Sequence, residues 1–148
     1  MNERPNPINK FNFLLDRWNL EYRVPKSQFG EEDYGSGEGD FKRILNDRYV
    51  TFDYHAKLTS GEGSAHALFA WDEKSKIYRY WWFEDSGAFM EATCNFLDEN
   101  TLCLNWHNSL FVQTFSKEEN GKIILQMRYP SNKKDYELVL EVIFTKKK

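Results

Sequence analysis

Three histidines stand on three different predicted strands, and converging imidazoles would form a metal site. His55, His66 and His107 each lie near the middle or the end of a strand. Three imidazoles on one ion leave a coordination position open, as in many catalytic zinc sites. His55, however, shares its strand face with Asp53 and Lys57, and we expect it to point outward. We therefore predict no metal site and interpret each histidine as a hydrogen-bonded wall or surface residue.

The same side chains suggest a second chemistry, proton transfer on a hydrophobic substrate. The general base would be His55, His66, Glu91 or His107. The chain has no Gly-x-Ser-x-Gly elbow, His-Glu-x-x-His, Gly-rich phosphate loop or Cys-x-x-Cys. His107, beside Trp106, is also the best candidate for ligating a haem inside a barrel, but the Gly-x-Trp-x-Gly-x-Gly signature of nitrobindin-like proteins is absent. We predict no catalytic set and no cofactor, and keep an enzyme as an alternative.

Arg79 is the one cation within a strongly aromatic strand. It shares a strand face with Trp81 and Phe83. On a lumenal face, its guanidinium would bind a ligand carboxylate or phosphate. On an outward face, it would stack on surface aromatics or pair diagonally with Glu91 on the next strand. The sequence leaves both positions open.

The composition excludes one class of partner and favours β-structure. The net charge is −3, and the only basic cluster is the tail Lys146-Lys147-Lys148, so no nucleic-acid footprint is expected. Phe, Tyr and Trp make up 17% of the 148 residues. This content favours an aromatic-lined β interior in one domain covering residues 1–148.

The N-terminus gives no export or membrane signal. Residues 1–7 hold no apolar h-region, and no stretch approaches the roughly 20 apolar residues that span a bilayer. We expect residues 1–7 to be flexible and the protein to be cytoplasmic, without a membrane partner. Cys94 and Cys103 flank a predicted turn and could approach across a hairpin, but in that compartment two buried free thiols are expected.

The first elements are a short helix and a half-buried strand. Asn6 is a suitable N-cap and Pro7 a suitable first helical residue. Ile8, Phe11 and Leu15 would share one face, and we expect that face to cover a barrel end or a sheet edge. Alternating apolar residues over 18–24 predict a strand. Residues 26–39 contain four glycines and four acidic residues, which predicts a long exposed loop.

The rest of the chain alternates strand-length apolar runs with turn-sized connectors. The predicted strands are 41–45, 49–58, 64–71, 77–84, 88–96, 101–107, 110–116, 122–129 and 136–145. Connectors such as Ser60-Gly61-Glu62-Gly63 and Pro130-Ser131-Asn132 are of hairpin length. Without intervening helices, these strands should form an antiparallel meander.

A meander of eight to ten strands is expected to close into a barrel. Closure removes exposed edges and leaves room for an interior ligand, whereas a Greek-key sandwich needs long crossing connections that are largely missing here. Trp81 and Trp82 point to opposite faces, so one ring lies outside. That ring could mark a homodimer interface, or the helix or the 26–39 segment could cover it.

The order of several segments resembles a known family. These segments are Phe11-Asn12-Phe13-Leu14-Leu15-Asp16-Arg17-Trp18, Gly37-Glu38-Gly39, Ile44-Leu45-Asn46-Asp47-Arg48-Tyr49-Val50, Ala70-Trp71-Asp72, Tyr78-Arg79-Tyr80-Trp81-Trp82 and Asp85-Ser86-Gly87 followed by Met90. Over about residues 8–145 they resemble the DUF1579 family of bacterial proteins. Asp16 and Asn46-Asp47 stand where that family usually has glycine. The resemblance implies a lipocalin-like calycin barrel and carries no established activity.

The sequence therefore predicts an all-β, lipocalin-like antiparallel barrel of about 8–10 strands with a short N-terminal capping helix. Its predicted role is to bind a small apolar or amphipathic molecule in the lumen. An enzyme and a non-catalytic protein-interaction module are the alternatives. The candidate lumenal residues are Tyr54, His66, Arg79, Trp81, Glu91, Trp106 and His107.

Overall fold

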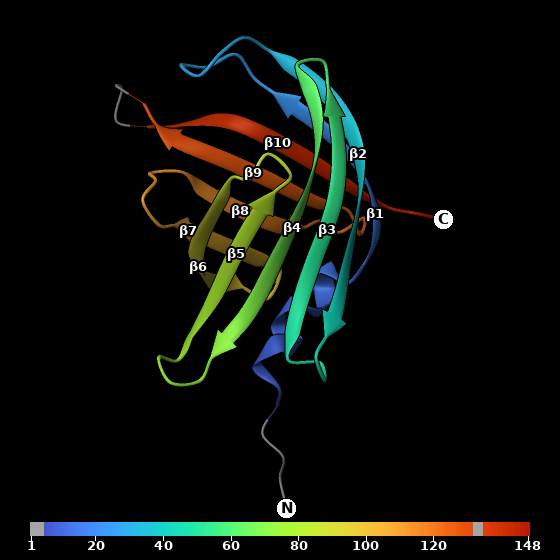
Figure 1. Cartoon of the computed structure of the whole chain (residues 1–148), viewed down its shortest axis with the longest axis vertical. Helices are drawn as coiled ribbons and strands as arrows, with labels where there is room; N and C mark the ends of the chain where they lie inside the picture. The colour runs from blue at the N-terminus through green and yellow to red at the C-terminus, as the bar shows by residue number, and fades with distance from the viewer. Residues whose placement is uncertain (1–4, 132–134) are drawn as a thin grey trace, which may run out of the picture.

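The computed structural model describes residues 5–131 and 135–148 and confirms the closed antiparallel barrel (Figure 1). Its strands are β1 (Asp16–Val24), β2 (Asp33–Ile44), β3 (Tyr49–Leu58), β4 (Gly61–Asp72), β5 (Ile77–Glu84), β6 (Phe89–Asp98), β7 (Thr101–Trp106), β8 (Val112–Lys117), β9 (Ile123–Pro130) and β10 (Tyr136–Lys146). Each strand pairs with its sequence neighbours, and β1 pairs with β10 to close the ring. The sheet therefore has no free edge strand.

Short hairpins fix the register of this ring. β3 and β5 begin and end at the residues that the sequence predicts, and β4 begins three residues earlier than predicted.

Two predictions reach residues outside the described ranges. The turn at 130–132 ends there, and the flexible terminus at 1–7 begins there, although Pro7 itself already starts the helix.

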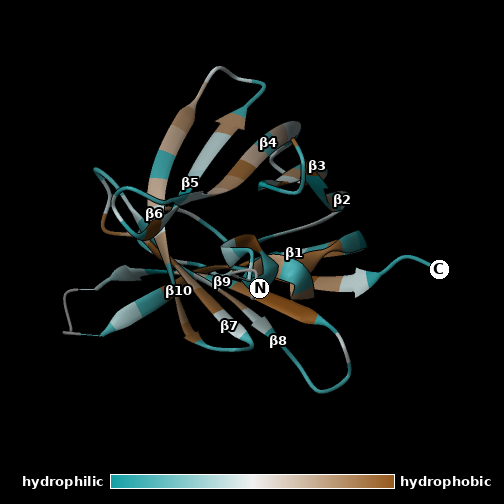
Figure 2. Ribbon diagram, turned by 90° about the horizontal axis from the view of Figure 1, so that it is seen from below, coloured by the Kyte–Doolittle hydropathy of each residue, from teal (hydrophilic) through white to brown (hydrophobic). Residues whose placement is uncertain are grey.

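The N-terminal helix η1 (Pro7–Leu14) closes one end of the barrel (Figure 2). The Asn6 side chain accepts a hydrogen bond from the Ile8 backbone N–H, as predicted for an N-cap. The helix is 3₁₀, with three residues per turn, so its buried face is Ile8, Phe11 and Leu14. Leu15, predicted for that face from α-helical spacing, follows the helix instead and is half-buried. Across residues 5–131 and 135–148, no helix has the length and apolar character to cross a bilayer.

The prediction of a long loop over residues 26–39 was wrong, because β2 begins at Asp33. Its glycines hide the alternation: Gly35, Gly37 and Gly39 take the same face as the buried Phe41. A side chain on Gly37 would overlap the carbonyl oxygen of His55 on β3. These glycines let β2 and β3 approach closely.

This close approach makes Gly37 a sensitive position. We expect Gly37→Ala to lower the free energy of unfolding by about 1–3 kcal/mol, because the methyl group must displace the β3 backbone. Ser36→Ala, one residue earlier on the exposed face, should change stability by less than about 0.5 kcal/mol. Urea unfolding followed by circular dichroism measures both. Equal effects would show that the glycine is not sterically required.

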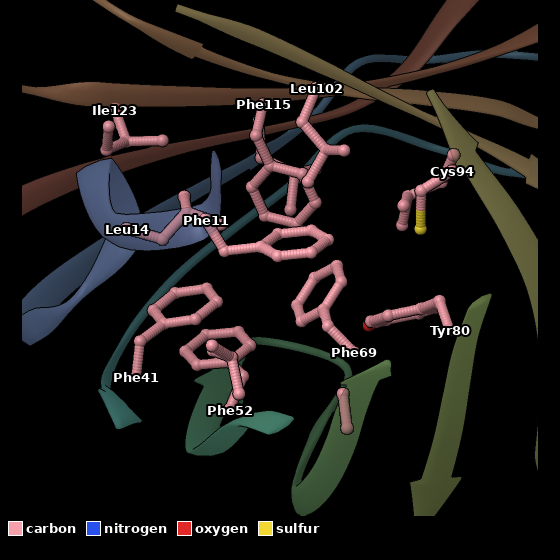
Figure 3. Packing of buried hydrophobic residues seen from close by; sticks show 14 of the residues in the cluster. Phe11, Leu14, Phe41, Phe52, Phe69, Tyr80, Cys94, Leu102, Phe115 and Ile123 are labelled. Atoms are coloured by element: carbon pink, nitrogen blue, oxygen red, sulfur yellow. The ribbon is translucent and has the colours of Figure 1, made fainter. Parts of the chain in front are cut away.

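An aromatic core fills the helix end of the barrel (Figure 3). Phe11 lies against Phe69, Tyr78 and Phe96, with ring centroids 4.7–5.2 Å apart. Phe41 and Phe52 stack at 3.9 Å. The rings of β2, β3, β4 and η1 therefore meet in one cluster. Because this cluster fills the helix end, an open cavity can lie only toward the other end of the barrel.

Both cysteines are buried free thiols, as predicted. Cys94 is opposite Leu104 in the β6–β7 pairing, whereas Cys103 is opposite Asn95. The thiols therefore lie on opposite faces of the sheet, with Cys94 in the core. Burial raises the pKa of both thiols, so little reactive thiolate forms at neutral pH.

Candidate functional site

The barrel contains a cavity of about 400 Å³ at the end away from η1. Its wall reaches the β3–β4 hairpin through Leu58 and Gly61, and the β5–β6 hairpin through Glu84 and Met90. The β3–β4 hairpin lies at the top of Figure 1 and η1 at the bottom. Pockets for small ligands usually measure about 300–1,000 Å³, so this space suits a compact molecule.

Small residues on one side of the barrel create this space. Ala56 pairs with Gly37 on β2 and with Gly63 on β4, so no large side chain fills that part of the lumen. Ala65, two residues further along β4, also lines the cavity. The opposite wall is bulky and is formed by Phe111, Phe115, Leu125, Met127, Leu140 and Val142. A flat ring system would therefore fit between the wall of small residues and the wall of bulky apolar residues.

Three tyrosines supply the phenol groups of the cavity, and Trp82 is hydrogen-bonded to one of them. Tyr22, Tyr54, Tyr80 and Trp82 all line it. The Trp82 indole N–H donates to the Tyr54 hydroxyl oxygen at 2.8 Å. Burial raises the pKa of Tyr22, Tyr54 and Tyr80, and the nearby Tyr54 raises the pKa of Tyr22 and Tyr80 further because two phenolates would repel. All three are neutral phenols at physiological pH.

Two further polar groups of the wall have no protein partner. Gln113 is 5% exposed and faces the cavity, and its side-chain amide makes no hydrogen bond within the described residues. The buried Trp106 indole N–H likewise has no acceptor there. A buried polar group left unpaired costs about 1–3 kcal/mol. A ligand with suitable polar atoms would recover that free energy.

The mouth of the cavity is acidic and partly covered by the segment between β1 and β2. A hollow lined by Phe29, Glu31, Glu32 and Asp33 adjoins the cavity and shares Phe111, Met127, Leu58 and Leu140 with it. Phe29 is 57% exposed, yet its ring packs against Phe111 and Tyr129 at 5.4 and 4.9 Å. This segment therefore borders the cavity at the end away from η1.

Two of the seven predicted lumenal residues line the cavity. Tyr54 and Trp106 are on its wall. The other five were placed on the wrong face, because β4 and β5 are apolar on both faces and a one-residue shift reverses every orientation. These five are His66, Arg79, Trp81, Glu91 and His107, which pair with partners on the outer face. Whether Tyr54 and Trp106 bind a ligand stays a prediction.

On the outer face, carboxylates pair with the candidate bases and with Arg79. His66 contacts Asp53, and His107 contacts Glu91 at 3.1 Å. Arg79 pairs with Asp72 at 2.8 Å across the β4–β5 hairpin, not with Glu91.

His55 also lies outside and contacts Ser64 Oγ and Glu62. In the described parts of the chain, no three His, Cys, Asp or Glu side chains are grouped to hold a metal ion. The histidines are thus distributed over the exterior and do not converge.

The wall residues that sequence reasoning missed include Tyr22, Tyr80, Trp82, Glu84 and Gln113. One signal was available for Gln113, because it lies between Phe111 and Phe115 on the same strand face. A polar side chain in such a row is either buried or in a cavity. The same test applied to β5 would have placed Glu84 on the face of Trp82.

Asp33 holds the mouth in place, which predicts a pH effect. Its carboxylate accepts hydrogen bonds from the backbone N–H groups of Tyr34, Thr59 and Ser60, joining β2 to the β3–β4 hairpin. The Ser60 side chain contributes most to lowering the pKa of Asp33 from 3.8 to about 2, and the backbone N–H groups of Tyr34 and Ser60 lower it further. A lowered pKa stabilises the fold above pH 3.8, and this contribution is lost as the pH falls toward 2.

We therefore expect wild type to be more stable than Asp33→Asn at pH 7 and the difference to shrink between pH 3.8 and about 2. Urea midpoints at several pH values measure the difference, and carboxyl-carbon NMR measures the pKa of Asp33 directly. A difference that does not vary with pH would contradict this role.

Comparison with one solved structure supports the fold. The chain is similar to the solved structure of an S-type phycobiliprotein lyase from Guillardia theta, with a TM-score of 0.62, 8% identity and 99% of each chain covered. It also matches a de novo designed fluorescence-activating β-barrel, with a TM-score of 0.46, 9% identity, and 92% and 95% of the two chains covered. At these identities the likeness concerns the fold alone.

No family model matches the chain, and no curated protein does. The resemblance to the DUF1579 family therefore stays a prediction.

Proposed function

We propose that this protein binds one small, largely apolar, ring-containing molecule in the cavity of its barrel. The observation that carries the proposal is Gln113, a residue 5% exposed that faces the cavity and makes no side-chain hydrogen bond in the described residues. An apolar wall with a few convergent polar groups is the usual composition of a ligand pocket. The candidate general bases lie outside the cavity, which favours binding over catalysis on a bound substrate.

Native mass spectrometry of protein purified from its own host tests this proposal. A retained molecule should add a fixed mass to the native protein and be absent after denaturation. The same protein, stripped of ligand, should bind N-phenyl-1-naphthylamine in a saturable 1:1 manner, with enhanced probe fluorescence in the apolar cavity. Absence of both a retained mass and probe binding would refute the proposal.

A second candidate role is self-association through the outer face of β5 and β6. Phe83 and Phe89 pair across these strands and are 47% and 73% exposed, beside Trp81. Paired exposed rings are typical of an interface. Analytical ultracentrifugation of wild type and Phe89→Ser measures this, with loss of a dimer in the variant as the expected result. If the wild-type protein is still a monomer at about 100 times the protein concentration used for probe binding, this role is excluded.

A further inference from the structure

The charges along the cavity differ from those of a site for anions. Among the described residues that line the cavity, the acid-base groups are three neutral tyrosines and Glu84, with no Lys, Arg or His. An anionic head group placed there would lose its hydration without gaining a counter-charge. The cavity itself therefore disfavours carboxylates, sulfonates and phosphates.

The approach to the cavity adds negative charge. Glu84 lies at the mouth, and its negative charge contributes to the raised pKa of Tyr54. Glu31, Glu32 and Asp33 line the adjoining hollow. Lys26 is 3.7 Å from Glu31 but does not line this hollow, and within the described residues no salt bridge joins Glu32 or Asp33 to a cation. Charges of one sign around a mouth repel ligands of the same sign over several ångströms.

The wall offers hydrogen-bond donors for a neutral ligand. Tyr54 already accepts from Trp82, so its hydroxyl hydrogen is free to donate. Gln113 adds an N–H₂ donor, and its side-chain amide makes no hydrogen bond within the described residues. Donors around an aromatic-lined space suit a ligand oxygen such as a carbonyl.

We infer that the cavity selects neutral aromatic molecules with a carbonyl-type oxygen and rejects anionic amphiphiles. This inference rests on the proposed binding function and specifies its ligand class. The charge part depends on Glu84 and the absence of lumenal cations, and the acceptor part depends on the Gln113 amide. The two parts can be tested by different variants.

A matched pair of probes tests the charge part. N-phenyl-1-naphthylamine is neutral, and 8-anilinonaphthalene-1-sulfonate has the same ring core with a sulfonate. We expect the anion to bind at least ten-fold more weakly to wild type at 50 mM salt, and Glu84→Gln to reduce this ratio at least three-fold. Glu91→Gln removes a carboxylate from the outer face of the next strand and should leave the ratio unchanged.

A neutral naphthalene ketone, 6-propionyl-2-dimethylaminonaphthalene, tests the acceptor part. Gln113→Met keeps the side-chain length and removes the amide, so the ketone should bind about five-fold more weakly, while N-phenyl-1-naphthylamine changes less than two-fold. Urea unfolding confirms that each variant is folded. Should Gln113→Met not fold, the ketone's emission in wild type is measured instead, and a hydrogen-bonded carbonyl gives a red-shifted band relative to its emission in alkane.

The outcomes separate this inference from the proposed function. If the sulfonate binds as tightly as the neutral probe, or if Glu84→Gln and Glu91→Gln behave alike, the selectivity is refuted while the cavity remains a binding site. If the ketone loses nothing on Gln113→Met or emits as in alkane, the acceptor part is refuted. If no probe binds, the proposed function itself fails.

Discussion

Replacing Phe11 by alanine is expected to lower the free energy of unfolding by about 3–5 kcal/mol, because the ring is fully buried at the closed end of the barrel. Phe11 contacts Phe69, Tyr78 and Phe96, which come from three different strands. The surrounding sheet is closed on itself and cannot collapse into the space that the ring leaves. Most of the cavity cost therefore persists.

Phe13→Ala is the matched control, because Phe13 lies on the same helix but is only half-buried and makes one ring contact, with Phe96 at 6.5 Å. This change should cost about 1 kcal/mol. Urea unfolding followed by near-ultraviolet circular dichroism gives both values. If the two variants lose the same stability, burial of the Phe11 ring does not hold the helix against the end of the barrel.

The fold could be predicted from the sequence largely because its turns are marked. β3 and β5 are each followed by polar, turn-forming residues, and their predicted bounds match the structure. The β2 strand was missed because alternation is detected through side chains, and Gly35, Gly37 and Gly39 have none on the inward face. In this region a tertiary requirement, close contact with β3, outweighs the low strand propensity of glycine.

The candidate site was harder to predict because orientation cannot be derived from an aromatic strand alone. On β5, Tyr80 and Trp82 face the lumen, whereas Arg79 and Trp81 face outward. One face of β5 carries Tyr78, Tyr80 and Trp82 and the other carries Trp81 and Phe83, so hydrophobicity does not decide which face is buried. The pairing of Trp82 with Ala67 decides it, since a small residue opposite gives the large ring room inside. That pairing is a property of the folded sheet.

A larger side chain on the wall of small residues should have the largest effect on ligand binding. Ala56 lines the cavity and pairs with Gly37 and Gly63, so a larger side chain at position 56 extends into open space. We expect Ala56→Phe to weaken N-phenyl-1-naphthylamine binding at least ten-fold, because the added ring occupies the ligand's volume. Stability should change by less than about 1.5 kcal/mol, since the ring enters a void instead of a packed core. Fluorescence titration and urea unfolding measure the two effects.

Lys57→Phe adds the same ring one residue later, on the outer face of β3, and separates occupation of the lumen from a general effect of an extra aromatic residue. This control should bind the probe within two-fold of wild type. Ala65→Leu, on the neighbouring strand, blocks the same space with a smaller group and serves if Ala56→Phe does not fold. A folded Ala56→Phe or Ala65→Leu protein with wild-type affinity would place the probe outside the barrel. Because glycine and alanine on one wall leave this space open, a ligand held there must be sensitive to both changes.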